Sequence, residues 1–149
     1  MEPLDFAYKK ITSDPSWLSR EIEDSEIPQF HNRDHWFQKN VQAELTWLKK
    51  LIKRNSHNES IANFLNLCFS AIIVKISNQD GETRWKAVEK NISDGYTIHI
   101  FRNTLFKNIK KSEALKSILN IEPHKATIFT AQAFDVPNLI GEPCIDLIV

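Results

Sequence analysis

The last five residues, Ile145-Asp146-Leu147-Ile148-Val149, predict a buried β-strand and constrain the fold more than any other segment. A short run of Ile, Leu and Val with one acidic residue near its start is typical of a central parallel strand. Residues 126–133 alternate in polarity and include Thr127, Ile128 and Phe129, which predicts one more strand before it. Two strands alone make a marginal sheet with an apolar edge open to a neighbour. The ending therefore favours an α/β chain that forms one piece of a larger sheet.

The residues before these strands predict a helix-rich region. Five segments have the pattern of helices, at about residues 3–12, 13–24, 34–54, 59–76 and 93–111, and a last helical turn is expected at residues 112–119. The segment from Glu59 to Ile76 is apolar nearly all round, so we expect a central, buried helix there. A polar loop follows at residues 77–84, and residues 85–91 fit neither a helix nor a strand clearly. We expect a helical region over residues 1–122 and a strand pair over residues 123–149, within a single domain.

Composition narrows the class of protein. A length of 149 residues suits one domain. The chain has 19 basic and 19 acidic residues, and zero net charge argues against strong autonomous binding to nucleic acid. Cys68 and Cys144 stand alone and show neither a disulfide pattern nor a zinc-site pattern, which favours a reduced, cytoplasmic setting. The first residues do not resemble a signal peptide, and no apolar stretch of about 18 residues is evident, so we expect no membrane span.

The best functional candidate is the polar loop Ser77-Asn78-Gln79-Asp80-Gly81-Glu82-Thr83-Arg84. Side-chain amides such as those of Asn78 and Gln79 can pair with base edges, and the Arg84 guanidinium can hold a phosphate or a carboxylate. A purely structural alternative stays open. In it, Asn78 and Asp80 cap and turn the chain, and Arg84 pairs with Asp80 or Glu82.

The same loop resembles the SNQD-x-(E/D)TR signature found in one bacterial and phage branch of the DNA amino-methyltransferases that use S-adenosylmethionine. Two further segments resemble this family. One is Ala131-Gln132-Ala133-Phe134-Asp135-Val136 with the final strand at residues 145–149. The other is Asp34-His35-Trp36-Phe37, followed by a helix that contains Glu44-Leu45 and Leu48. The resemblance covers about residues 28 to 149, and the loop is its most specific part.

The resemblance implies a Rossmann-like methyltransferase sheet and methyl transfer to an exocyclic amino group of adenine or cytosine in DNA. It places Asp135 near the bound S-adenosylmethionine. It assigns DNA contact or active-site support to five loop residues: Asn78, Gln79, Asp80, Thr83 and Arg84.

Two family motifs are missing from the chain. Its three glycines, Gly81, Gly95 and Gly141, stand far apart and cannot form the Gly-rich cofactor motif, and no Pro-Pro pair provides the PPY motif that carries catalysis. The chain therefore resembles the middle of a methyltransferase. We expect it to be inactive alone, to act with DNA only within the intact parent, and to have no catalytic residue of its own.

Two other interpretations remain. The chain can be a stand-alone helical interaction module, or a subunit of a split enzyme whose open strand edge pairs with a complementary methyltransferase fragment. Sequence-independent DNA binding through the basic faces Lys49–Arg54 and Lys107–Lys111 is disfavoured by the zero net charge. His31 and His35 are four residues apart, but no further ligand accompanies them, so we expect no metal site.

Overall fold

A computed structural model describes residues 2–55, 58–80 and 83–119, without the side chains of residues 83–85 and 119. The chain divides into two compact units, residues 1–114 and 115–149. The first unit contains almost everything described below, and the last residues of α7 belong to the second. The two predicted strands and Asp135 lie outside the described residues.

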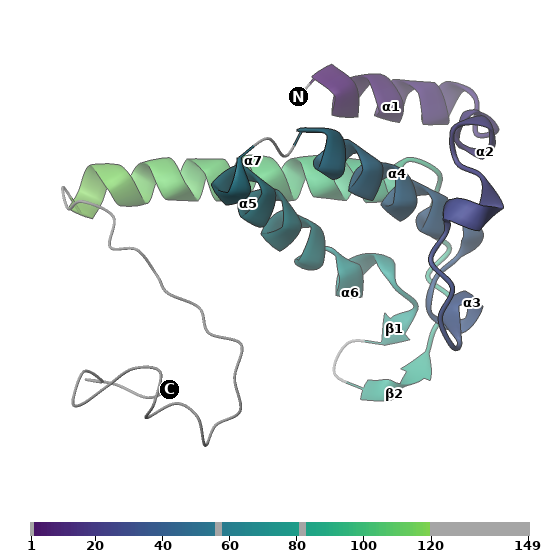
Figure 1. Cartoon of the computed structure of the whole chain (residues 1–149). Helices are drawn as coiled ribbons and strands as arrows, with labels where there is room; N and C mark the ends of the chain where they lie inside the picture. Colours follow the sequence, from purple (N-terminus) through teal and green to yellow (C-terminus); the bar gives the residue numbers. More distant parts are fainter. Residues whose placement is uncertain (1, 56–57, 81–82, 120–149) are drawn as a thin grey trace, which may run out of the picture. The chain divides into compact units, whose positions relative to one another are not determined.

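The first unit is a helical assembly with one small antiparallel hairpin (Figure 1). Its sheet has two strands, β1 and β2. In chain order the elements are α1 (Glu2–Ser13), α2 (Trp17–Glu21), the short 3-10 helix η1 (Asp24–Glu26), α3 (Arg33–Trp36), α4 (Lys39–Asn55), α5 (Glu59–Ser70), α6 (Ile73–Ile76), β1 (Gln79–Asp80), β2 (Thr83–Ala87) and α7 (Tyr96–Leu119). The helix-rich character that the sequence predicts is confirmed. No Rossmann-like sheet occurs among the described residues.

Two predicted long helices are each broken in the structure. The predicted helix at residues 34–54 divides into α3 and α4, because Phe37 adopts an extended conformation with φ −137° and ψ 131°. The predicted helix at residues 59–76 divides into α5 and α6 at a two-residue turn, residues 71–72. α5 begins directly after Asn58, which caps it. The Oδ1 atom of Asn58 accepts hydrogen bonds from Ser60 N at 2.8 Å and Ile61 N at 3.4 Å.

The core is one apolar cluster formed mainly by α1, α2, α4 and α7. Leu48 of α4 and Ile98 of α7 have no exposed surface. Two contacts join α1 to α7: the Tyr8 and His99 rings have centroids 5.5 Å apart, and Arg102 Nε lies 2.6 Å from Asp5 Oδ1. The amphipathic stripes predicted for α4 and α7 therefore do face the core.

The expectation of a central, buried helix at residues 59–76 is wrong for the described part of the chain. Within α5 only Cys68 is buried, whereas Ile61 is 52% exposed and Leu67 is 63% exposed. The helix packs on α4, and Cys68 also meets Asn108 of α7, but the described residues leave Ile61 and Leu67 largely exposed. An apolar helix surface cannot show by itself which of its sides has a neighbour.

The expectation that no apolar stretch of about 18 residues occurs is wrong for residues 59–76. Residues Glu59–Ile76 have a mean hydropathy of 1.4, and by length and composition they could cross a membrane. Such a segment is weak evidence for a membrane span, because core helices of soluble proteins have the same composition. In the structure this segment is not one continuous helix, since it breaks between Ser70 and Ile73.

Candidate functional site

The polar loop predicted at residues 77–84 folds as part of an antiparallel hairpin. Gln79 pairs with Ala87 and Asp80 pairs with Thr83, with an irregularity in register between them. The second strand, β2, continues to Ala87 and takes in part of the segment that the sequence left unassigned. Thr83, Trp85 and Ala87 alternate with the basic residues Arg84 and Lys86, which is a strand pattern. The pattern is too short to predict a strand from the sequence.

Asn78 anchors the base of this hairpin to α3. Its backbone N–H donates to Trp36 O at 2.8 Å, and its side-chain Nδ2 donates to His35 O at 3.1 Å. Its own carbonyl accepts from Val88 N at 2.7 Å. Asn78 is 9% exposed, so its amide serves the fold and presents no free edge to a nucleic acid.

The other predicted loop residues differ in position. Gln79 is half-buried and Asp80 is exposed. The backbones of Thr83 and Arg84 lie in β2, while their side chains are outside the described part. The structure thus brings the loop residues together on one hairpin. Asp135, predicted to lie near a cofactor, falls outside the described residues.

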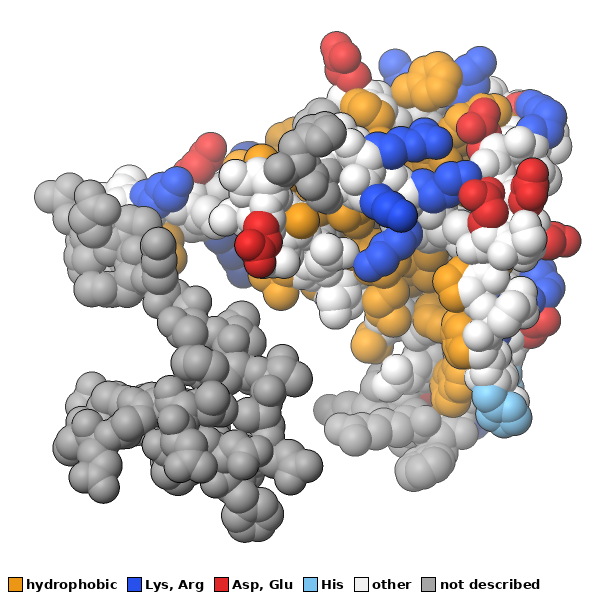
Figure 2. Space-filling view, viewed as in Figure 1, with side chains coloured by type: hydrophobic (Ala, Val, Ile, Leu, Met, Phe, Trp, Pro, Cys, Tyr) orange, Lys and Arg blue, Asp and Glu red, His pale blue; other side chains and the backbone are white. Residues whose placement is uncertain are grey.

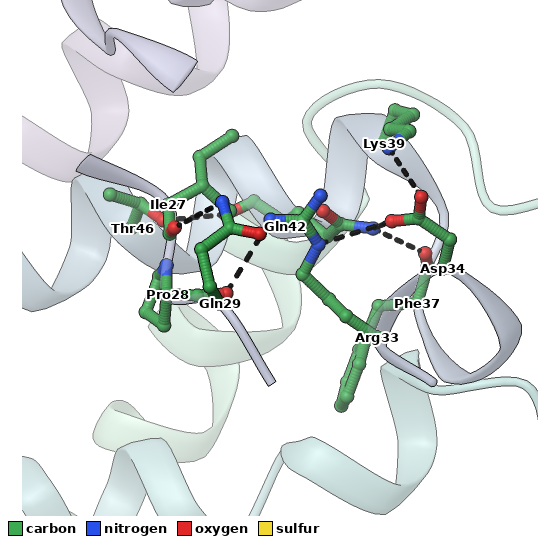
Figure 3. A network of polar contacts seen from close by, with 9 residues as sticks. All are labelled: Ile27, Pro28, Gln29, Arg33, Asp34, Phe37, Lys39, Gln42 and Thr46. Carbon is green, nitrogen blue, oxygen red and sulfur yellow. Dashed lines mark hydrogen bonds and ion pairs between the residues drawn. The ribbon is translucent and has the colours of Figure 1, made fainter. Parts of the chain in front are cut away.

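Asp34 organises a second polar network beside the hairpin base (Figure 3). Its carboxylate accepts from Lys39 Nζ at 2.7 Å, Gln42 Nε2 at 2.9 Å and Arg33 Nε at 3.1 Å. These donors, Lys39 first among them, hold the pKa of the Asp34 carboxyl well below its usual range. Gln42 also donates to Phe37 O at 2.7 Å, which fixes the break between α3 and α4.

Glu44 is a buried acidic residue whose structural role was not predicted from the sequence. Its side chain has no exposed surface, and its carboxylate accepts from Gly95 N at 2.6 Å, Thr97 N at 2.9 Å and Ile98 N at 3.3 Å. It therefore caps the start of α7 from α4. Burial raises the Glu44 pKa to about 7, although the N–H donors favour the ionised form. The sequence signal for this role is an acidic residue at a core-facing position of α4.

A groove lies along α4, and its other walls are the segment before α4 and part of α5 and α6. Its volume is about 620 Å³. We call it the α4 groove, and it is lined by Glu26, Ile27, Pro28, Phe30, Arg33, Phe37, Gln42, Leu45, Thr46, Lys49, Lys50, Lys53, Phe69 and Ile73. Figure 2 shows Lys and Arg side chains gathered next to hydrophobic surface on this face of the molecule. The groove could not be predicted from the sequence, because its walls come from four separate segments.

Metal chemistry has no support in the part of the chain that the structure describes. No group of three His, Cys, Asp or Glu side chains there could hold a metal ion. His35 packs its ring against Trp36 at a centroid distance of 4.7 Å.

Comparisons with protein-family models, with curated proteins and with solved structures find no match for this chain.

Proposed function

We propose that this chain is part of a DNA amino-methyltransferase that uses S-adenosylmethionine, and that it supplies the helical support and a hairpin that faces DNA. The observation behind this proposal is the contact between two separate segments of the family resemblance. Asn78, in the loop signature, binds the backbone of His35 and Trp36, in the Asp34–Phe37 segment. Two distant motifs that meet at one place are expected to serve one function.

In this proposal the residues of the hairpin have two roles, support and DNA contact. Asn78 is the support that fixes the hairpin to α3. Gln79, Asp80, Thr83 and Arg84 are the residues that approach DNA, with Arg84 contacting a phosphate and Gln79 a base edge. A hairpin held on rigid helices is the usual way in which a fold places such residues.

The chemistry belongs to other parts of the parent enzyme. The chain holds neither the Gly-rich motif nor the PPY motif, so methyl transfer requires segments that supply them. In the proposed parent, residues 126–133 and 145–149 are strands of the Rossmann-like sheet, and Asp135 lies near S-adenosylmethionine at a strand end.

The test is methyl transfer by the reading frame extended at both ends. We expect tritiated methyl groups to pass from S-adenosylmethionine to DNA. Arg84→Ala is expected to raise the KM for DNA about tenfold, because it removes a phosphate contact. Arg54→Ala, at the exposed end of α4, is the matched control and is expected to leave KM unchanged. Absence of transfer to any DNA would contradict the proposal.

A specific observation favours a second candidate, an interaction module or a subunit of a split enzyme. The apolar side chains of Ile61, Leu67 and Val74 are all more than half exposed in the described part of the chain. Apolar surface of this kind is typical of a protein–protein contact.

Size in solution separates the two candidates. A module is expected to form a defined monomer or dimer in sedimentation analysis, and Leu67→Glu should shift a dimer to the monomer. A piece of a larger enzyme is expected to aggregate or to be poorly stable by itself. A defined monomer or dimer, together with no methyl transfer by the extended frame, would favour the module over the enzyme piece.

A further inference from the structure

The α4 groove has the size and lining of a small-molecule site, and it is separate from the hairpin assigned above. Its volume of about 620 Å³ falls within the usual range for ligand pockets, roughly 300–1,000 Å³. The inner surface is formed largely by hydrophobic side chains, among them Phe30, Phe37 and Leu45. Phe30 and Phe37 meet edge to face with centroids 6.3 Å apart, so the groove offers aromatic walls to a flat ligand.

The charges around this groove favour an anion. Four cationic side chains and one carboxylate are among its described lining residues. Lys50 is neutralised by Glu26 at 2.8 Å, and Arg33 contacts Asp34 at 3.1 Å. Lys49 and Lys53 make no ion pair with any other described residue.

Lys49 and Lys53 also stand four residues apart on one side of α4, where like charges repel. Lys49 is held in place by the neutral amide oxygen of Asn66 at 3.1 Å and by the Phe69 ring at 5.3 Å from its centroid. A bound anion between the two ammonium groups would remove this repulsion.

Gln42 adds an independent sign of a site in the groove wall. Its Nε2 donates twice, to Asp34 and to Phe37, which fixes the orientation of the amide. Its Oε1 is buried and has no hydrogen-bond partner among the described residues. An acceptor left in this state is costly, and a hydrogen-bond donor on a molecule bound in the groove would satisfy it.

We propose that the α4 groove binds a small amphipathic organic anion, with its flat apolar body between the Phe30–Phe37 wall and α4. The acidic group of the ligand, a carboxylate, sulfonate or phosphate ester, lies between Lys49 and Lys53. The proposal is independent of the methyltransferase assignment, since it uses none of the hairpin residues.

The first experiment compares two fluorescent probes on the full chain. Anilinonaphthalene sulfonate carries an apolar aromatic body and an acidic group, whereas N-phenylnaphthylamine has nearly the same body without the charge. We expect the anionic probe to bind at one site and about tenfold more tightly than the neutral probe, which corresponds to about one charge contact. Equal affinities, or many weak sites for the anionic probe, would overturn the proposal.

Matched variants locate the site. Phe30→Ala removes an aromatic wall and is expected to weaken anionic-probe binding about fivefold. Phe6→Ala is its control, because Phe6 is 53% exposed against 52% for Phe30, and it too meets another ring edge to face, Trp17 at 6.1 Å. Lys53→Glu is expected to weaken binding of the anionic probe about tenfold and to leave the neutral probe unchanged. Lys107→Glu, on α7, is its control.

Folding is checked separately, so that loss of binding is not confused with loss of structure. All four variants are expected to keep the far-ultraviolet circular dichroism and the cooperative unfolding of the parent chain, because each changed side chain is exposed. Equal loss of binding in Phe6→Ala and Phe30→Ala would place the probe elsewhere and overturn the assignment to the α4 groove.

Discussion

At the scale of single residues, Glu44 has an unusual environment for a carboxylate in the described part of the chain. A carboxylate without exposed surface accepts three backbone N–H groups at the start of α7. Hydrogen bonds and the positive end of the helix dipole favour its charged form, while dehydration opposes it. The balance raises the Glu44 pKa to about 7, from an ordinary value of 4.5.

This environment makes stability depend on pH. Because the folded-state pKa lies above the unfolded one, the folded protein binds the proton more tightly. The Glu44 contribution is complete below the unfolded pKa and is lost as pH rises through about 7. Between roughly pH 5 and pH 8 we expect the free energy of unfolding to fall by about 2–3 kcal/mol from this group alone.

Urea denaturation of the parent and of Glu44→Gln at both ends of this pH range measures the effect. Glu44→Gln should lose this fall in the free energy of unfolding between the two pH values. Glu21→Gln, which changes an exposed carboxylate, should keep it. A parent that loses no more stability across this range than Glu44→Gln does would contradict the raised Glu44 pKa.

Gly95 is the second residue whose identity the fold requires. Its φ of +81° lies in the left-handed region, and an added Cβ would stand 3.3 Å from Tyr8 Cδ2. We expect Gly95→Ala to lower the free energy of unfolding by about 1–2 kcal/mol. Gly95→Asn should cost less, because Asn tolerates this conformation better and meets the same neighbour. Chemical denaturation compares the two, and equal costs would locate the strain in the Tyr8 contact rather than in the backbone.

At the scale of elements, helical periodicity predicted where helices occur but not where they end. α5 begins directly after Asn58, whose side chain caps it, and Asn is a residue type favoured at this position. The break at Phe37 was not visible, because it depends on Gln42 donating to the Phe37 carbonyl from the next helix. The hairpin at β1 and β2 was predicted as a loop, since its pairing depends on contacts that Asn78 makes with α3.

The Asn78 contacts give a prediction for the hairpin. Asn78→Ala leaves the His35 carbonyl without its donor, and we expect a loss of about 1–3 kcal/mol in the free energy of unfolding. Gln79→Ala, at the neighbouring half-buried position, should change the free energy of unfolding by less than about 0.5 kcal/mol. Equilibrium denaturation measures both. A neutral Asn78→Ala variant would remove the support role assigned to this residue.

At the scale of the whole molecule, the sequence predicted the helix-rich class and the core-facing sides of α4 and α7. It did not predict which side of α5 has a neighbour, because Leu67 and Cys68 look equally apolar and only the fold separates them. The candidate loop was found by residue type. The α4 groove was not, since Phe30, Lys53 and Phe69 come together only in three dimensions.

Two leucines test this view of the core. Leu48 has no exposed surface, so Leu48→Ala should lower the free energy of unfolding by about 2–5 kcal/mol. Leu67 is 63% exposed, and Leu67→Ala should change it by less than about 0.5 kcal/mol. Thermal or urea unfolding of the full chain measures both. A large cost for Leu67→Ala would mean that the apolar side of α5 is covered.

The Glu44 cap also bears on how the molecule opens. The first N–H groups of a helix usually exchange their hydrogens with solvent quickly, because no carbonyl of the helix accepts from them. In α7 the N–H groups of Thr97 and Ile98 instead meet a carboxylate inside the core, 53 and 54 positions away along the chain. Their exchange requires α4 and α7 to separate. The start of α7, where a helix normally frays, is thereby linked to the opening of the core itself.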